Sequence, residues 1–146
     1  MLEEPLAAPG VAGLRRLQAN CRFPLAIDES WSALAVQDDL LLDPPVHRLV
    51  LKPPRLGGLL PALSLAQRAS AVGVECIVTS SVDSACGVLC AAHLAAALDN
   101  GLAHGLATSC WLREDVGAPP LVTQGRMRLP VVAGSGFTPH PAPSPD

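Results

Sequence analysis

The sequence predicts an α/β fold in which parallel strands are covered by helices. Short apolar runs recur at nearly even spacing, and a segment of helical periodicity separates each run from the next. This alternation is the repeated βα unit, whose strands lie parallel because each helix carries the chain back to the starting edge. The 146 residues have the length of one domain and are 49% hydrophobic but only 3% aromatic, so the core must be aliphatic.

The expected elements are a strand end at residues 1–6, a helix at 10–20, a strand at 23–28, a helix at 30–42, a strand at 47–52, a helix at 59–71, a strand at 75–80, a helix at 84–100 and a strand at 104–109. Ser30 can cap the helix that it opens. Pro44 stops that helix, because the residue before a proline avoids the α-conformation. Gly73 and Gly101 end the two later helices, since glycine accepts the left-handed conformation there. A hairpin is expected at 121–132.

Residues 1–137 are assigned to one domain and residues 138–146 to a disordered, proline-rich tail. Two architectures fit the strand pattern. One is an open doubly wound sheet of about five strands, and the other is part of a (β/α)8 barrel, which needs about 250 residues in full. Spacing alone favours the open sheet.

Charge and cysteine content exclude several classes of protein. The net charge is −3, and acidic and basic residues are spread along the chain, so nothing indicates binding to nucleic acid or to a membrane. The five cysteines include no C-x-x-C pair, which predicts reduced thiols and a cytoplasmic location. The N-terminus opens on acidic residues and not on a basic segment followed by an apolar core, so no signal peptide is expected.

Three charged side chains each close a strand, namely Glu3, Asp28 and Lys52. The carboxyl ends of parallel strands are where α/β folds place their chemistry, so the three are expected on one rim. Two carboxylates suit a hard cation such as Mg²⁺, whose charge favours the neutral form of a nearby lysine and makes it a usable general base. The set suits proton abstraction next to a carboxylate. The alternative for Lys52 alone is a surface lysine whose stem covers apolar atoms.

Four motifs occur in an order that resembles the later active-site strands of o-succinylbenzoate synthases, the MenC-type branch of the enolase superfamily. They are Leu2-Glu3-Glu4-Pro5, Ala26-Ile27-Asp28-Glu29-Ser30, Leu51-Lys52-Pro53 followed by Gly57-Gly58, and Thr79 to Ser84 followed by Gly87. The resemblance covers about residues 2–109. It implies a partial (β/α)8 barrel, the C-terminal half of an enolase-superfamily barrel.

The resemblance also implies roles for individual residues. Glu3 and Asp28 would bind Mg²⁺, and Lys52 would be the catalytic base or its conjugate acid. The substrate carboxylate would be lined by Ser80, Ser81 and Gly87. Separately, Gly57 opens an expected helix, whose free N–H groups can bind a carboxylate, although glycine also simply permits a turn.

The implied reaction is the dehydration of 2-succinyl-6-hydroxy-2,4-cyclohexadiene-1-carboxylate to 2-succinylbenzoate, a carbon–oxygen lyase step of menaquinone and phylloquinone biosynthesis. The family carries a K-x-K lysine and a further metal Asp on earlier strands. The chain is therefore expected to be truncated and to need a missing N-terminal half or self-association. Two alternatives stay open: another racemase, epimerase or cycloisomerase of the superfamily, and a non-catalytic remnant or open-sheet binding module.

Overall fold

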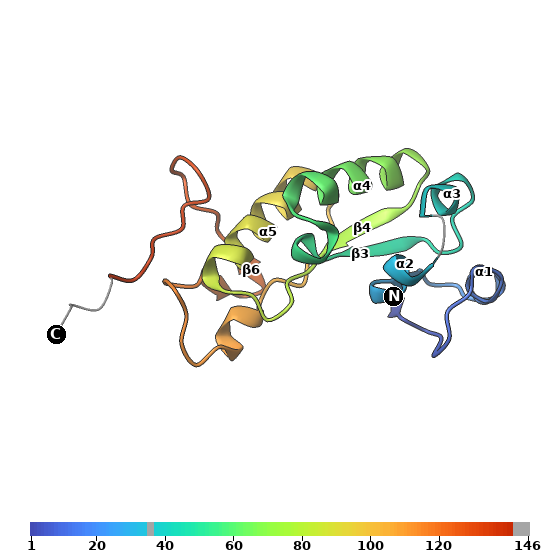
Figure 1. Ribbon diagram of the computed structural model, residues 1–146, viewed down its shortest axis with the longest axis horizontal. Coiled ribbons are helices and arrows are strands. Elements are labelled where there is room, and N and C mark those ends of the chain that lie inside the picture. Colours follow the sequence, from blue (N-terminus) through green and yellow to red (C-terminus); the bar gives the residue numbers. More distant parts are fainter. Residues whose placement is uncertain (35–36, 142–146) are drawn as a thin grey trace. The chain divides into compact units, whose positions relative to one another are not determined.

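The computed structural model describes residues 1–34 and 37–141. The chain divides into two compact units, which are treated separately below. The first unit holds residues 1–77 with 100–102, and the second holds residues 78–99 with those from 103 onward. Figure 1 traces the elements of both units along the chain.

A parallel sheet organises the first unit. Strand β1 (Leu2–Glu3) pairs with β2 (Leu25–Ile27), and β2 pairs with β3 (Arg48–Leu51), both in parallel. Strand β4 (Glu75–Val78) extends the order to β1-β2-β3-β4, so neighbours in the chain are neighbours in the sheet. The predicted α/β fold with parallel strands is confirmed.

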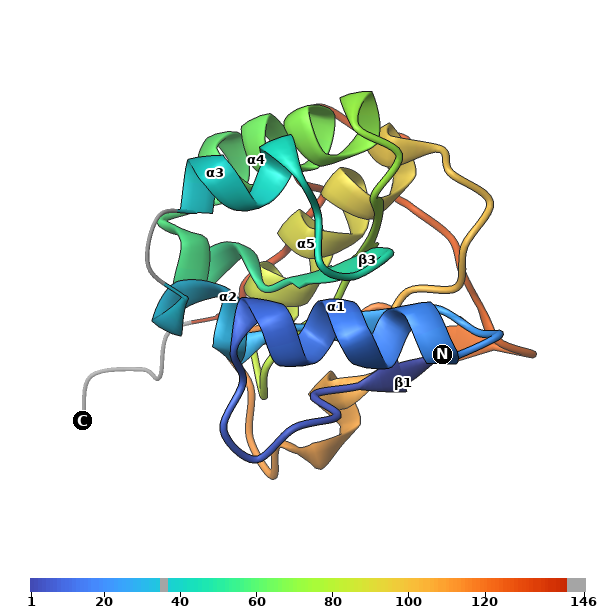
Figure 2. The same ribbon diagram turned by 90° about the vertical axis from the view of Figure 1, so that its right-hand side faces the viewer.

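Helices connect these strands: α1 (Val11–Asn20), α2 (Glu29–Ala33), α3 (Gln37–Leu42), the 3-10 helix η1 (Pro53–Leu56) and α4 (Leu59–Ala71). In the view of Figure 2, α3 and α4 lie above β3, and α1 lies below β3, on the side of the sheet that faces the viewer. All residues of β2 are buried, as are the last three of β3. Strands covered on both faces take continuous apolar runs and not alternating patterns, which is why these segments are aliphatic throughout.

The predicted helix over residues 30–42 is two helices in the structure. Helix α2 ends at Ala33, and the C-cap residue Leu34 has an extended backbone (φ −74°, ψ 122°) and a buried side chain. Residues 35–36 lie outside the described part of the chain, and α3 begins directly after them. The helix at 59–71 has the predicted bounds.

In the second unit, α5 (Ala85–Leu98) buries a face of small and aliphatic side chains, among them Ala85, Val88 and Leu89. The predicted hairpin is present: β5 (Val122–Thr123) pairs antiparallel with β6 (Arg126–Met127). Its two turn residues, Gln124 and Gly125, both have positive φ, as a type I′ hairpin turn requires.

The predicted strand at 104–109 is wrong. Only Gly105 makes a bridge, to Thr79, and Thr108–Trp111 form the 3-10 helix η2. The Thr108 hydroxyl donates to the Ser81 carbonyl at 2.5 Å. This bond ties the first residue of η2 to the loop after β4.

Near the C-terminus, Pro139 bridges Gly117, and the His140 amide donates to the Val116 carbonyl at 2.9 Å. The tail predicted at 138–146 therefore begins on hydrogen-bonded residues. Its last part, 142–146, lies outside the described residues, so the tail stays a prediction. All five cysteines are free, and burial raises the pKa of the Cys76 thiol to about 12. No helix within the described ranges is long and apolar enough to cross a membrane.

Candidate active site

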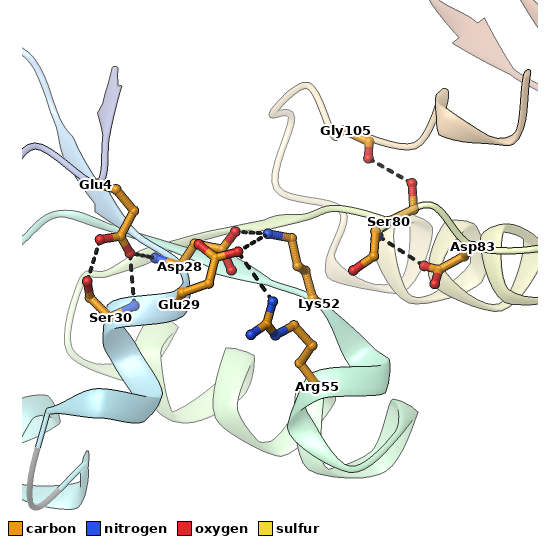
Figure 3. A network of polar contacts seen from close by, with 10 residues as sticks. Glu4, Asp28, Glu29, Ser30, Lys52, Arg55, Ser80, Asp83 and Gly105 are labelled. Atoms are coloured by element: carbon orange, nitrogen blue, oxygen red, sulfur yellow. Dashed lines mark hydrogen bonds and ion pairs between the residues drawn. The ribbon is translucent and has the colours of Figure 1, made fainter. Parts of the chain in front are cut away.

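The candidate active site lies where three neighbouring strands of the first unit end. Glu3 is the last residue of β1, Asp28 follows β2, and Lys52 follows β3. The strands pair in parallel, with Glu3 opposite Ala26 and Ile27 opposite Leu49, so their carboxyl ends meet at one edge. Figure 3 shows the side chains of Asp28 and Lys52 pointing toward each other across this edge.

An ion pair joins two of the predicted residues. The Lys52 Nζ donates to Asp28 Oδ2 and, at 2.8 Å, to Glu29 Oε1. The side chain of Asp28 is only 5% exposed and that of Lys52 only 16%. Glu29 also faces Arg55, whose Nη1 lies 3.5 Å from the same Oε1 atom. A lysine buried to this degree against carboxylates is not the surface lysine of the alternative interpretation.

The pKa values of the pair follow from burial and mutual contact. Burial raises the pKa of Asp28 above its usual value, against the lowering effect of Lys52. Burial acts to lower the pKa of Lys52, but its hydrogen bonds to Asp28 and Glu29 outweigh that effect and raise the pKa overall. The hydrogen bond from Lys52 is also the main reason why the pKa of Glu29 is lowered. Lys52 is therefore a charged ammonium in this arrangement, and it can accept a proton only after these contacts weaken.

Glu3 is coupled to the same group of charges. Burial and then the negative charge of Asp28 raise the pKa of Glu3, while Lys52 acts in the opposite direction. Glu3 and Asp28 thus repel each other, and a cation between them would relieve that repulsion. The described residues contain no cluster of three or more metal-binding side chains. Two carboxylates nevertheless fit Mg²⁺, because this ion keeps several waters and often takes only one or two carboxylates from a protein.

A fourth residue at this edge, Glu4, was not predicted from the sequence to have a role of its own. Its carboxylate accepts hydrogen bonds from the backbone N–H of Asp28 at 2.7 Å, from the N–H of Ser30 at 3.0 Å and from the Ser30 hydroxyl. Its backbone has a φ of 45°, which is uncommon for a residue with a side chain. The only signal in the sequence was the doubled glutamate before Pro5.

The predicted substrate residues Ser80 and Ser81 lie in the second unit and bond to their own surroundings. The Ser80 hydroxyl lies 2.7 Å from Thr108 Oγ1 and 3.3 Å from the Gly105 carbonyl. The Ser81 N–H donates to Asp83 Oδ2 at 3.1 Å. Substrate contact by either serine stays a prediction.

At both predicted glycines, one in each unit, the local backbone or its neighbours disfavour a residue with a side chain. Gly57 has a φ of 90° and ends η1, and its N–H and that of Gly58 both donate to the Pro53 carbonyl. These amides are thus engaged inside the chain. At Gly87, a Cβ would lie 3.1 Å from the Cβ of Asp83, so a larger residue would push against the loop before α5. Their binding roles also stay predictions.

Comparison with known proteins gives consistent matches. The family model described as "Enolase C-terminal domain-like" matches residues 1–142. The o-succinylbenzoate synthase of Mycobacterium tuberculosis is 34% identical over 143 residues, covering 97% of this chain and 40% of that protein. The L-Ala-D/L-amino acid epimerase of Maribacter sp. is 28% identical over 138 residues, covering 94% of this chain and 40% of that protein.

Solved structures give the same picture. Muconate cycloisomerase from Pseudomonas fluorescens superposes with a TM-score of 0.80 at 27% identity, covering 94% of this chain and 38% of that one. A mandelate racemase/muconate lactonizing enzyme from Roseiflexus sp. gives a TM-score of 0.78 at 31% identity, with 94% and 40% covered. The chain spans two fifths or less of the length of these relatives.

Proposed function

The chain belongs to the Enolase C-terminal domain-like family, and from this premise we propose that it supplies the carboxyl-terminal part of an enzyme that removes a proton from a carbon next to a carboxylate. Membership confirms the predicted fold, an α/β structure with a parallel sheet that matches the C-terminal barrel half of these enzymes. The relatives include a synthase, epimerases and cycloisomerases, so membership leaves the reaction open.

One observation carries the proposal: a nearly buried lysine contacts a nearly buried carboxylate at adjacent strand ends, with a second carboxylate coupled to both. In the proposed enzyme, Lys52 moves the substrate proton at its Nζ atom. Asp28 fixes the end of the flexible Lys52 side chain in its ammonium form, and Lys52 takes up the substrate proton only as the neutral amine, once that contact weakens. Glu3 and Asp28 would hold Mg²⁺, which when bound supplies positive charge beside the substrate carboxylate.

For the reaction itself we propose the dehydration of 2-succinyl-6-hydroxy-2,4-cyclohexadiene-1-carboxylate to 2-succinylbenzoate, a cytoplasmic step of menaquinone or phylloquinone synthesis. The support is similarity: 34% identity over 143 residues to an o-succinylbenzoate synthase, against 28% over 138 residues to an epimerase. Ser80, Ser81, Gly57 and Gly87 remain the proposed substrate contacts.

A second candidate is an epimerase or racemase that moves the same kind of proton without losing water. The N-succinyl-L-Arg/Lys racemase of Bacillus cereus, 27% identical over 94 residues, supports it. Both candidates use the same charged residues, so they differ in product and not in the first chemical step.

The two candidates are separated by one experiment on the full chain. The chain is assayed with Mg²⁺, alone and after co-expression with the part of the M. tuberculosis synthase that it does not cover. Absorbance follows loss of the cyclohexadiene, and NMR in D₂O follows exchange in a panel of dipeptides and N-succinyl amino acids. The matched control carries Lys52→Ala. Lysine-dependent dehydration supports the synthase, and lysine-dependent exchange without dehydration supports the epimerase. Activity that survives Lys52→Ala contradicts both.

A further inference from the structure

Asp28 lies at the N-terminus of α2, where the carboxylate of an aspartate normally caps the helix. It is the N-cap residue of α2, and an aspartate there ordinarily accepts a hydrogen bond from the backbone N–H of the second or third helical residue. Asp28 makes no such bond. Its carboxylate contacts Lys52 instead.

Glu4 supplies the missing cap from the neighbouring strand. Ser30 is the second residue of α2, and its N–H donates to Glu4 Oε1 at 3.0 Å, while the Asp28 N–H donates to the same atom at 2.7 Å. Figure 3 shows the Glu4 carboxylate over the start of α2, next to Ser30. The backbone supports this reach, because the Glu4 N–H donates to the Ala26 carbonyl at 3.0 Å and fixes β1 against β2.

We propose that Glu4 is a positioning residue: it caps α2 from the adjacent strand and so leaves the Asp28 carboxylate available to the candidate active site. The inference rests on the proposed function for what Asp28 does there, but the exchange of capping partners is a property of the fold alone. Neither a cation nor a substrate needs to touch Glu4.

The physical reason is competition for one donor. Without Glu4, the buried Ser30 N–H loses its acceptor, and an unsatisfied buried amide is unfavourable. The Asp28 carboxylate, two residues earlier, is then the acceptor that an N-cap aspartate supplies, once its backbone (φ −123°, ψ −93°) turns to the extended conformation of such caps. Satisfying the amide would draw that carboxylate away from Lys52.

The second unit offers a matched control for loss of a cap. Asp115 also caps a helix from a distance: both of its carboxylate oxygens accept from the Ala85 N–H at the start of α5, at 3.0 and 2.8 Å. Asp115→Ala therefore removes a comparable contact without touching Glu3, Asp28 or Lys52. It should lower stability and leave the candidate site unchanged.

The test compares Glu4→Ala, Glu4→Gln and Asp115→Ala in the full chain. The position of the Asp28 carboxylate is read from crystal structures or from NMR of the Ser30 amide, and Mn²⁺ affinity is read by electron paramagnetic resonance. In Glu4→Ala we expect the Asp28 carboxylate to accept from the Ser30 N–H, and Mn²⁺ to bind about 10- to 100-fold more weakly. Glu4→Gln keeps an acceptor oxygen and should stay within about threefold of the unmodified chain, while Asp115→Ala should unfold earlier with unchanged affinity.

Glu4→Met, which keeps the length of the side chain but not its acceptor, replaces the alanine variant if that variant does not fold. The inference is overturned if the Asp28 carboxylate still contacts Lys52 in Glu4→Ala or Glu4→Met. It is also overturned if Glu4→Gln does not preserve the position of Asp28 and the Mn²⁺ affinity. If the unmodified chain binds no Mn²⁺, the metal-binding part of the proposed function fails. The position of Asp28 in the variants still decides the role of Glu4.

Discussion

Removing Lys52 should destabilise the chain more than removing its partner Asp28, because the two substitutions leave different groups behind. Lys52→Met leaves a carboxylate that is only 5% exposed without its cation. Breaking a fully buried pair in this way costs about 3–5 kcal/mol, and breaking an exposed pair costs about 0–1 kcal/mol. Lys52 is 16% exposed, so the structure places its loss between these limits, at about 2–3 kcal/mol.

Substitution of the partner, Asp28→Asn, should cost only about 1 kcal/mol of unfolding free energy. The cost is small because burial already disfavours the charged form of the carboxyl group that is removed. The double variant should then be more stable than the sum of the two losses implies, with a coupling energy of about 1–2 kcal/mol. Urea unfolding of the full chain at pH 7, followed by circular dichroism, measures all three. Arg48→Met, which breaks the more exposed pair with Glu75, is the control. A loss below about 0.5 kcal/mol for Lys52→Met would refute the claim that Asp28 is buried against it.

Three further predictions concern single residues. Lys52→Ala in the complemented enzyme should reduce proton exchange about 10²- to 10⁴-fold and leave Mn²⁺ affinity nearly unchanged, and wild-type exchange in this variant would assign the base elsewhere. Glu3→Gln should raise the urea midpoint at pH 7 and lose that advantage below about pH 4.5. The pKa of Glu3 is raised in the folded chain, so its ionisation destabilises the fold only at pH values above about 4.5. Burial lowers the pKa of His104, whose Nδ1 accepts from the Val78 N–H at 3.0 Å, so the free energy of unfolding should fall as the pH drops below about 6.5. His104→Gln should flatten that pH dependence, and an unchanged pH profile in this variant would contradict the prediction.

Much of the fold followed from local signals. The helix at 59–71 was predicted to its ends, because glycines bound it on both sides and apolar residues recur on one face between them. The strand predicted at 104–109 failed for the opposite reason. His104-Gly105-Leu106 alternates like a strand, but the structure has one bridge at Gly105 and then η2, whose Thr108 bonds to Ser81, a residue far away in the sequence.

The candidate site was predictable to the same limit. A charge that closes a strand has a defined position once the strands are parallel, which is why Asp28 and Lys52 could be expected on one rim from the sequence, although the ion pair between them was not predicted. Glu4 could not be assigned in this way. Its role depends on a left-handed backbone at the end of β1 and on the register that brings it over α2, and neither is encoded in the spacing of the motifs.

The charged set at the strand ends cannot by itself select the reaction. Proton removal next to a carboxylate is common to dehydration and epimerisation, and Lys52 would serve either. Discrimination must therefore depend on groups that hold the rest of the substrate, for which the sequence predicts the loop at 79–84. The two serines of that loop are already hydrogen-bonded, Ser80 to Thr108 and the Ser81 N–H to Asp83, whereas the buried Thr79 hydroxyl has no partner among the described residues. Selection by such a loop would depend mainly on fit, and a change at Thr108 should alter the choice of substrate more than the rate of proton removal.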